Sequence, residues 1–181
     1  MIQIYDKNTI KPTTNGKMVL LPNSCKLQAT LNGSWILNMN HPTDSEGRWK
    51  YIEEESILSV PTFVGKGQLF RVNKLTKKDY SIDVVAYPIF FDAAKEVFLE
   101  DVRPTIKNGQ EALDIMTSGT NFEGKSDIST SSTAYFERRN LLDAISGSDE
   151  PTFLQRWGGE ILYDNYKIII NERVGGNYGA E

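Results

Sequence analysis

The segment GTNFEGKS, Gly119 to Ser126, has the residue types of a phosphate-binding P-loop, G-x-x-x-x-G-K-[ST]. In such a loop, glycines such as Gly119 and Gly124 let backbone N–H groups surround the phosphates. Lys125 would reach the outer phosphates and Ser126 would hold magnesium. This chemistry requires the loop to leave a buried strand and run directly into a helix, because the helix N-terminus contributes to anion binding. The flanking segments therefore decide whether the match is functional.

The flanking segments favour a structural role. Asn108 is a good N-cap and Glu111 completes a capping box, so a helix is predicted to begin after Asn108. Gly119 then takes the position that ends this helix. Residues 126–136 alternate at period two, which predicts a polar strand entered through a turn at Gly124-Lys125. A helix before the segment and a strand after it leave nucleotide binding as the weaker alternative.

Other residues capable of chemistry are few. His41, the only histidine, lies beside Pro42 and Asp44 and is expected in a solvent-facing polar loop. Cys25 is expected to be a small apolar packing residue. Residues 53–55 are three glutamates, but neighbouring residues of a strand point to opposite faces, so a solvated charged turn is expected. No nucleophile, base and oxyanion donor come together, and we expect no catalytic residue, no metal and no cofactor.

Composition fits a soluble globular protein made inside the cell. The chain has 181 residues, 39% of them hydrophobic, and one cysteine, so no internal disulfide can form. Residues 1–97 carry 12 Lys+Arg against 10 Asp+Glu and residues 98–181 carry 8 against 14, so neither half is basic enough for nucleic-acid binding. No signal peptide and no apolar run of membrane-spanning length are found, and no membrane anchor is expected.

The first half of the chain predicts a β-barrel or sandwich. Short runs of strand-forming residues alternate with turn signals such as Asn15-Gly16 and Asn32-Gly33. Trp35 and Trp49 could stack on sugar rings, which keeps a carbohydrate-binding module as an alternative, although aromatic residues in alternating strands more often lie in the core. The expected strands are Ile2–Tyr5, Lys17–Leu21, Cys25–Asn32, Ser34–Asn40, Arg48–Ile52, Ile57–Phe63, Gln68–Asn73 and Tyr80–Tyr87.

After Pro88 the composition favours helices. Asp92 can cap a helix with Val97 and Phe98 on its inner side, and a further helix is expected at about Arg138–Ser146. A short helical turn capped by Ser148 or Asp149 and containing Pro151 should then end at Gly158-Gly159. A hairpin of Glu160–Tyr163 and Tyr166–Arg173 would turn at Asp164-Asn165. The prediction is an α+β chain with domains at 1–97 and 98–181.

Three segments together resemble the N-terminal region of phage tail hub proteins, the tail-associated lysin or prophage endopeptidase-tail group of long-tailed phages. The first is EGRWKYIEEESILSVP with GQLFRVNKLTKKDYSIDVVAYPIFFD, the second is the helix after Asn108, and the third is RNLLDAISGSDEPTFLQRWGGEILYDNYKIIINERVG. The resemblance covers about the whole chain. The residues that carry it are Trp49, Phe70, Asp92, Trp157, Gly158, Gly159 and Glu160.

The resemblance implies an N-terminal β-barrel domain followed by a small α/β domain, as in baseplate hub proteins. It implies a non-enzymatic virion protein at the tail tip, made in the bacterial cytoplasm and assembled as a homotrimer. Its partners would be the distal tail protein ring, the tail tube or tape-measure protein, and a tail fibre or lysin region. Peptidoglycan cleavage would lie in C-terminal regions that longer members carry and this chain does not.

Overall fold

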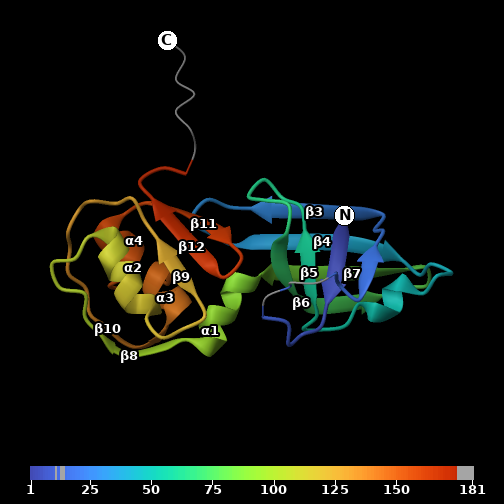
Figure 1. Ribbon diagram of the computed structural model, residues 1–181, viewed down its shortest axis with the longest axis horizontal. Helices are drawn as coiled ribbons and strands as arrows, with labels where there is room; N and C mark the ends of the chain where they lie inside the picture. Colours follow the sequence, from blue (N-terminus) through green and yellow to red (C-terminus); the bar gives the residue numbers. More distant parts are fainter. Residues whose placement is uncertain (11, 13–14, 175–181) are drawn as a thin grey trace, which may run out of the picture. The chain divides into compact units, whose positions relative to one another are not determined.

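The structure is a computed structural model that describes residues 1–10, 12 and 15–174, and it divides into two compact units, Met1–Ile89 and Phe90 onward (Figure 1). The division falls in the short 3₁₀ helix η2 (Ile89–Asp92), ahead of the expected boundary at residue 97. Phe90 explains the difference, because its ring already packs against Phe122 and Tyr163 of the second unit, with ring centroids 5.2 and 5.9 Å apart.

The first unit is built on one antiparallel sheet of seven strands in the order β2-β1-β5-β6-β7-β4-β3. Most of the expected strands are present, and β6 runs longer than expected because it continues past a bulge between Val72 and Lys74. The strands are β1 (Ile2–Tyr5), β2 (Met18–Leu20), β3 (Ser24–Ala29), β4 (Trp35–Pro42), β5 (Ile57–Val60), β6 (Gln68–Lys77) and β7 (Ser81–Pro88).

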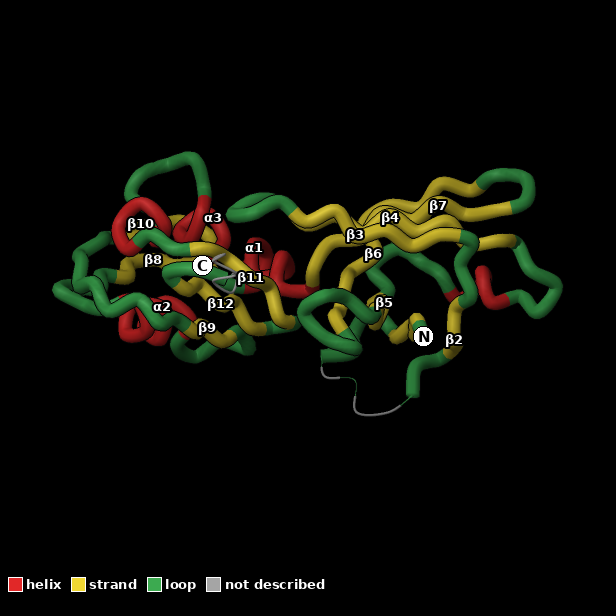
Figure 2. The backbone as a smooth tube through the Cα atoms, turned by 90° about the horizontal axis from the view of Figure 1, so that it is seen from above, coloured by secondary structure: helices red, strands yellow, loops and turns green. Residues whose placement is uncertain are grey.

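The sheet is a curled half-barrel, whereas the sequence predicted a β-barrel or sandwich. In Figure 2, β3, β4, β6 and β7 form one layer, and β5 and β2 curve round beneath it. Among the described strands no ladder joins β2 to β3. Pro22 lies between these two strands and has no N–H to contribute. The connecting segment instead bonds to β4, where the Asn23 N–H donates to the Asn40 carbonyl at 2.8 Å.

The inner face of the curled sheet forms the core of the first unit. Strand β4 shows the alternation clearly, since Trp35, Leu37, Met39 and His41 are buried while the residues between them are more exposed. Phe70 of β6 is fully buried in the same core. The alternating pattern expected for this half of the chain is therefore confirmed on β4.

The expected strand Arg48–Ile52 is wrong, because this segment forms the 3₁₀ helix η1 (Arg48–Tyr51). Gly47 precedes it with φ of 71°, and the Arg48 N–H donates to the Asp44 carboxylate at 2.9 Å. Turn geometry and a local hydrogen bond thus override the strand-like residue types. Trp49 is partly buried and packs against the core.

The second unit contains short helices and two small sheets. Strands β8 and β10 pair antiparallel, while β12 pairs antiparallel with β11 and parallel with β9. The elements are α1 (Ala93–Glu96), β8 (Phe98–Val102), α2 (Gly109–Thr117), β9 (Glu123–Lys125), β10 (Phe136–Asn140), α3 (Leu141–Ser146), α4 (Phe153–Trp157), β11 (Glu160–Asp164) and β12 (Lys167–Asn171).

Several local predictions for this unit are confirmed. Asn108 and Glu111 form the capping box at the start of α2. Gly119 follows α2 with φ of 74°, the left-handed conformation expected of a helix-terminating glycine. The hairpin of β11 and β12 is present, but its two-residue turn is Asn165-Tyr166, because Asp164 pairs with Lys167.

Other predictions for this unit are wrong. Residues 126–135 form no strand, although an isolated bridge pairs Ser132 with Lys107. Strand β10 then occupies the start of the expected helix at 138. Phe98 begins β8 instead of extending α1. Thr152, not Ser148 or Asp149, caps α4, and it forms a capping box with Gln155. A second capping box thus places the helix start after Pro151.

An aromatic cluster forms part of the core of the second unit. Phe91 contacts the Tyr163 ring edge to face at 5.1 Å, and Phe122 packs against Tyr166 at 5.6 Å. Burial raises the pKa of Tyr163 to about 12, since the phenolate would lose its hydration. The cluster joins η2, the segment before β9 and the β11–β12 hairpin into one core.

Gly124 is the point where α2 packs on β9. A Cβ atom at this position would lie 2.5 Å from the Leu113 Cβ atom. We expect Gly124→Ala to lower the free energy of unfolding by about 1–3 kcal/mol, because the added methyl group overpacks this contact. Urea denaturation measures the change. Gly65→Ala is the matched control, since nothing lies within 4 Å of its Cβ position, and it should change stability by less than about 0.5 kcal/mol. Equal stability of the two variants would contradict this account of the packing.

Candidate interaction surfaces and a polar pocket

The RWGGE segment holds the second unit together. The Trp157 ring stacks on Phe153 with centroids 4.9 Å apart, and its Nε1–H donates to the Lys107 carbonyl at 2.8 Å. Gly158 and Gly159 have φ of 76° and 103°, which a residue with a side chain rarely adopts. A Cβ at Gly159 would also lie 2.9 Å from the Asn171 carbonyl oxygen.

Glu160, the last residue of the RWGGE segment, also has a structural role. Its carboxylate accepts a hydrogen bond from the Val174 N–H at 2.7 Å, beyond the end of β12. Asp92 is buried at the start of α1 and does not cap that helix through its side chain. Among the other residues that carry the sequence resemblance, the three aromatic residues pack in a core and the two glycines set the chain direction; they are Trp49, Phe70, Trp157, Gly158 and Gly159.

The P-loop pattern does not form a phosphate loop in the structure. Gly119 ends α2, and Gly124 and Lys125 lie in β9. Gln110 of α2 holds this strand with its side-chain amide, which accepts from the Ser126 N–H at 2.8 Å and donates to the Gly124 carbonyl at 3.1 Å. The described residues contain no helix between Ser126 and α3, so the helix N-terminus that phosphate binding requires is not in place.

His41 is not in an exposed loop, as the sequence predicted, but has an exposed fraction of 0% at the end of β4. Its Nε2 atom accepts a hydrogen bond from the Leu21 N–H at 3.3 Å. Because Nε2 is the acceptor, Nδ1 carries the ring hydrogen and donates to the Pro42 carbonyl at 2.8 Å. The ring thus ties the segment after β2 to β4. Sequence reasoning missed this because His41 occupies an inward position of the β4 alternation, a signal masked by the polar residues that follow.

The remaining candidate chemistry is dispersed. Within the described residues no group of three His, Cys, Asp or Glu side chains is arranged to hold a metal ion. Cys25 is half-buried, and burial raises the pKa of its thiol. None of the helices in the described ranges has the length and apolar character needed to cross a bilayer.

The first unit exposes an aromatic residue over a buried one. Trp35, expected in the core or as a sugar-stacking residue, is buried, and the Phe63 ring lies against it with centroids 5.1 Å apart. Phe63 itself is 70% exposed, in the loop between β5 and β6. Leu31, in the turn before Trp35, is also exposed. The first unit thus leaves the Phe63 ring, packed on Trp35, largely exposed to solvent.

The second unit exposes apolar side chains beside the β8–β10 ribbon. Ile106 is 76% exposed and has φ of 51°, an uncommon conformation for a β-branched residue. Its N–H donates to the Thr133 hydroxyl at 2.9 Å, so the segment lies beside the chain that leads to Tyr135. Tyr135 is exposed, and the Arg103 guanidinium lies 5.6 Å from its ring centroid. We call Arg103, Ile106 and Tyr135 the ribbon surface.

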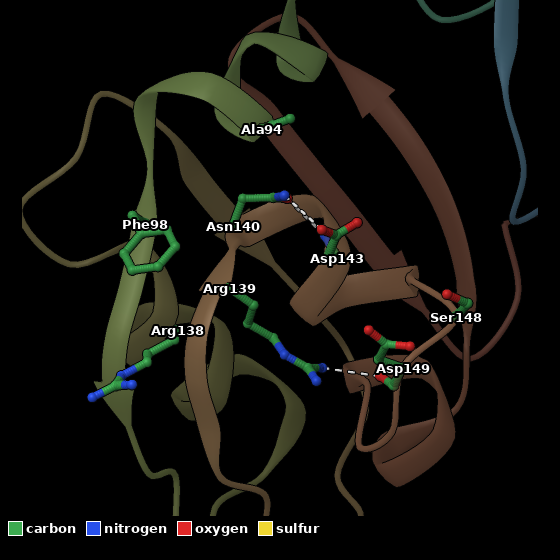
Figure 3. Close-up of a pocket in the computed structure, with 8 residues that line it drawn as sticks. All are labelled: Ala94, Phe98, Arg138, Arg139, Asn140, Asp143, Ser148 and Asp149. Carbon is green, nitrogen blue, oxygen red and sulfur yellow. Dashed lines mark hydrogen bonds between the residues drawn. The ribbon is translucent and has the colours of Figure 1, made fainter.

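A polar pocket of about 410 Å³ lies in the second unit (Figure 3). Figure 3 shows Phe98 and Arg138 on the β8–β10 side and Ser148 and Asp149 across from them on the loop after α3. Arg139 reaches across the pocket floor, and Asn140 and Asp143 are joined by a hydrogen bond of 2.6 Å. The lining residues are Ala94, Phe98, Arg138, Arg139, Asn140, Asp143, Ser148 and Asp149.

Comparison with solved structures finds similarity to prophage tail protein gp18 from Listeria monocytogenes EGD-e. The TM-score is 0.67 at 17% sequence identity, and the match covers 94% of this chain and 50% of that chain. No family model matches the chain, and no curated protein matches it significantly. The chain therefore has a fold similar to that of a phage tail protein and spans half the length of that protein.

His41→Leu tests the role of the buried imidazole. Leucine keeps an apolar volume at this position but leaves the Leu21 N–H and the Pro42 carbonyl without their side-chain partner. We expect the free energy of unfolding to fall by about 1–3 kcal/mol in urea denaturation. Asn38→Ala on the exposed face of the same strand is the control and should stay within about 0.5 kcal/mol of the wild type. A wild-type stability for His41→Leu would show that the two hydrogen bonds contribute nothing.

Proposed function

We propose that this chain is a structural component of a phage tail tip or baseplate hub. The observation that carries the proposal is the similarity in fold to a prophage tail protein over 94% of the chain. The sequence resemblance to tail hub proteins, carried by Trp49, Phe70 and the RWGGE segment, supports the same role from different information. In this role the protein belongs to the virion and is made in the bacterial host cytoplasm.

The hub role is a joining function. The chain would connect the distal tail protein ring and the tail tube or tape-measure protein to a host-facing tail fibre or lysin region. It would do so as a homotrimer and without enzymatic activity of its own. Any peptidoglycan cleavage would belong to C-terminal regions of longer members of the hub family.

The exposed apolar side chains support an assembly role. Phe63 belongs to the first unit and the ribbon surface to the second, so each unit exposes apolar side chains. Contacts between subunits need such surfaces, because apolar area removed from water stabilises association. We assign Phe63 to docking on the distal tail protein ring and the ribbon surface to contacts between hub subunits.

Phe63→Glu tests the docking assignment. A charge at this exposed position should block co-elution with purified distal tail protein in size-exclusion chromatography, while circular dichroism and the melting temperature stay close to wild type. Tyr80→Glu is the matched control, because Tyr80 is also exposed but lies in the turn between β6 and β7, at the other end of β6. Wild-type complex formation by Phe63→Glu would mean that docking does not use this surface.

The oligomeric state is tested by light scattering across a wide range of protein concentrations. A trimer predicts a molar mass of three times 20.4 kDa. Ile106→Glu should then return the mass to that of one chain, because a carboxylate at the ribbon surface would be desolvated in the contact. If the wild-type chain has the mass of one chain at every concentration, these residues do not self-associate.

A further inference from the structure

The walls of the polar pocket are fixed by internal hydrogen bonds. The Arg139 guanidinium donates to the carbonyl oxygens of Asp149 and Pro151 at 3.0 and 2.8 Å, which holds the loop after α3 against β10. On the opposite side Asn140 caps α3 by accepting from the Asp143 N–H at 2.9 Å. These bonds occupy Arg139 and the Asn140 side chain, so the pocket is formed before any ligand arrives.

Several groups that line the pocket take no part in these hydrogen bonds. In the described part of the chain the Arg138 guanidinium and the Asp149 carboxylate make no hydrogen bond or ion pair, and Ser148 is exposed beside Asp149. Phe98 is 60% exposed and presents an apolar ring at the same pocket. The pocket thus combines free donors, free acceptors and one aromatic side chain.

Arg138, which lines the pocket, has an unusual backbone conformation. Its φ is 50°, although it lies in the middle of strand β10, between residues that pair regularly with β8. A residue with a side chain is strained in this conformation, and such strain is found preferentially at ligand-binding positions. The exposed Arg138 side chain fills no core space that would account for the strain.

The charges of the pocket are balanced. Arg138 and Arg139 supply two positive charges, and Asp143 and Asp149 supply two negative charges. A charged ligand of either sign would therefore meet as much repulsion as attraction. A ligand with many hydroxyl groups can donate to the carboxylates and accept from the guanidinium, and the C–H face of its ring can pack on an aromatic side chain.

From these observations we propose that the pocket binds a neutral saccharide. Its volume of about 410 Å³ lies in the lower part of the range for small-molecule sites and suits one or two sugar rings. Phe98 packs against the ring, and Ser148 and Asp149 contact its hydroxyl groups. This inference stands apart from the assembly role, because the pocket includes neither Phe63 nor the ribbon surface.

The test is a titration of the ¹⁵N-labelled full chain with two neutral disaccharides, maltose and N,N′-diacetylchitobiose, followed by two-dimensional NMR. We expect saturable shifts of the Phe98 and Ser148 amide signals at millimolar concentrations of at least one sugar, unchanged by added sodium chloride. Phe98→Ala should raise the dissociation constant about tenfold, the effect of losing one ring contact. Asp149→Asn should also weaken binding and keep the fold, because Arg139 contacts the backbone carbonyl of this residue and not its carboxylate.

Ile115→Ala is the matched control, since Ile115 of α2 is also an exposed apolar residue of the same unit but neither lines the pocket nor belongs to the ribbon surface. It should bind the sugar as the wild type does. The proposal is overturned if neither disaccharide gives saturable shifts, or if Phe98→Ala binds as tightly as Ile115→Ala. It is also overturned if inorganic phosphate, added as a charged comparison, saturates the same signals and both sugars do not.

Discussion

The seven-stranded sheet has one apolar face, and the described residues of the first unit form no α-helix to cover it, so most of that face is buried against the sheet itself. This constraint accounts for the curl of the half-barrel, because residues from strands far apart in the sheet order, such as Ile4 of β1 and Leu37 of β4, can share one core only if the sheet bends. It also accounts for η1, which places Trp49 and Ile52 against that core. His41 occupies an inward position near the end of β4 and supplies the polar contact to the segment after β2 that a strand ladder would otherwise provide.

The second unit buries its apolar side chains in a different way, between short helices and strands that approach one another closely. Gly124 brings β9 against α2, and Gly158-Gly159 let the chain leave α4 and enter β11 in a conformation that residues with side chains rarely adopt. Trp157 then fixes this exit by a hydrogen bond to the Lys107 carbonyl, fifty positions earlier in the chain. None of these elements is long enough to be stable alone, so the fold of this unit depends on tertiary contacts between them.

The sequence predicted the features that depend on interactions between residues close together in the chain. Capping boxes, helix-terminating glycines and strand alternation act within a few residues, and Asn108, Gly119 and β4 accordingly formed as predicted. Residues 126–135 alternate like a strand but have no partner strand, and pairing is a long-range property that no local pattern contains. The pocket could not be predicted at all, since Phe98 and Asp149 are brought together by the β8–β10 pairing and the bonds of Arg139. The left-handed backbone of Arg138 has no sequence signal, because arginine is not a residue that favours it.

The residues that carry the sequence resemblance to tail hub proteins are mostly folding residues. Trp157, Gly158 and Gly159 would be needed in any protein that uses the same exit from α4, whatever its surface binds. Binding is determined instead by residues that the core does not require. Ile106 and Arg138 are of this kind, because both are exposed and both adopt a backbone conformation that is unfavourable for their side chains. Strain that no packing contact explains is better accounted for by a function at the surface, and the two positions belong to the two separate surfaces of the second unit, the ribbon surface and the pocket.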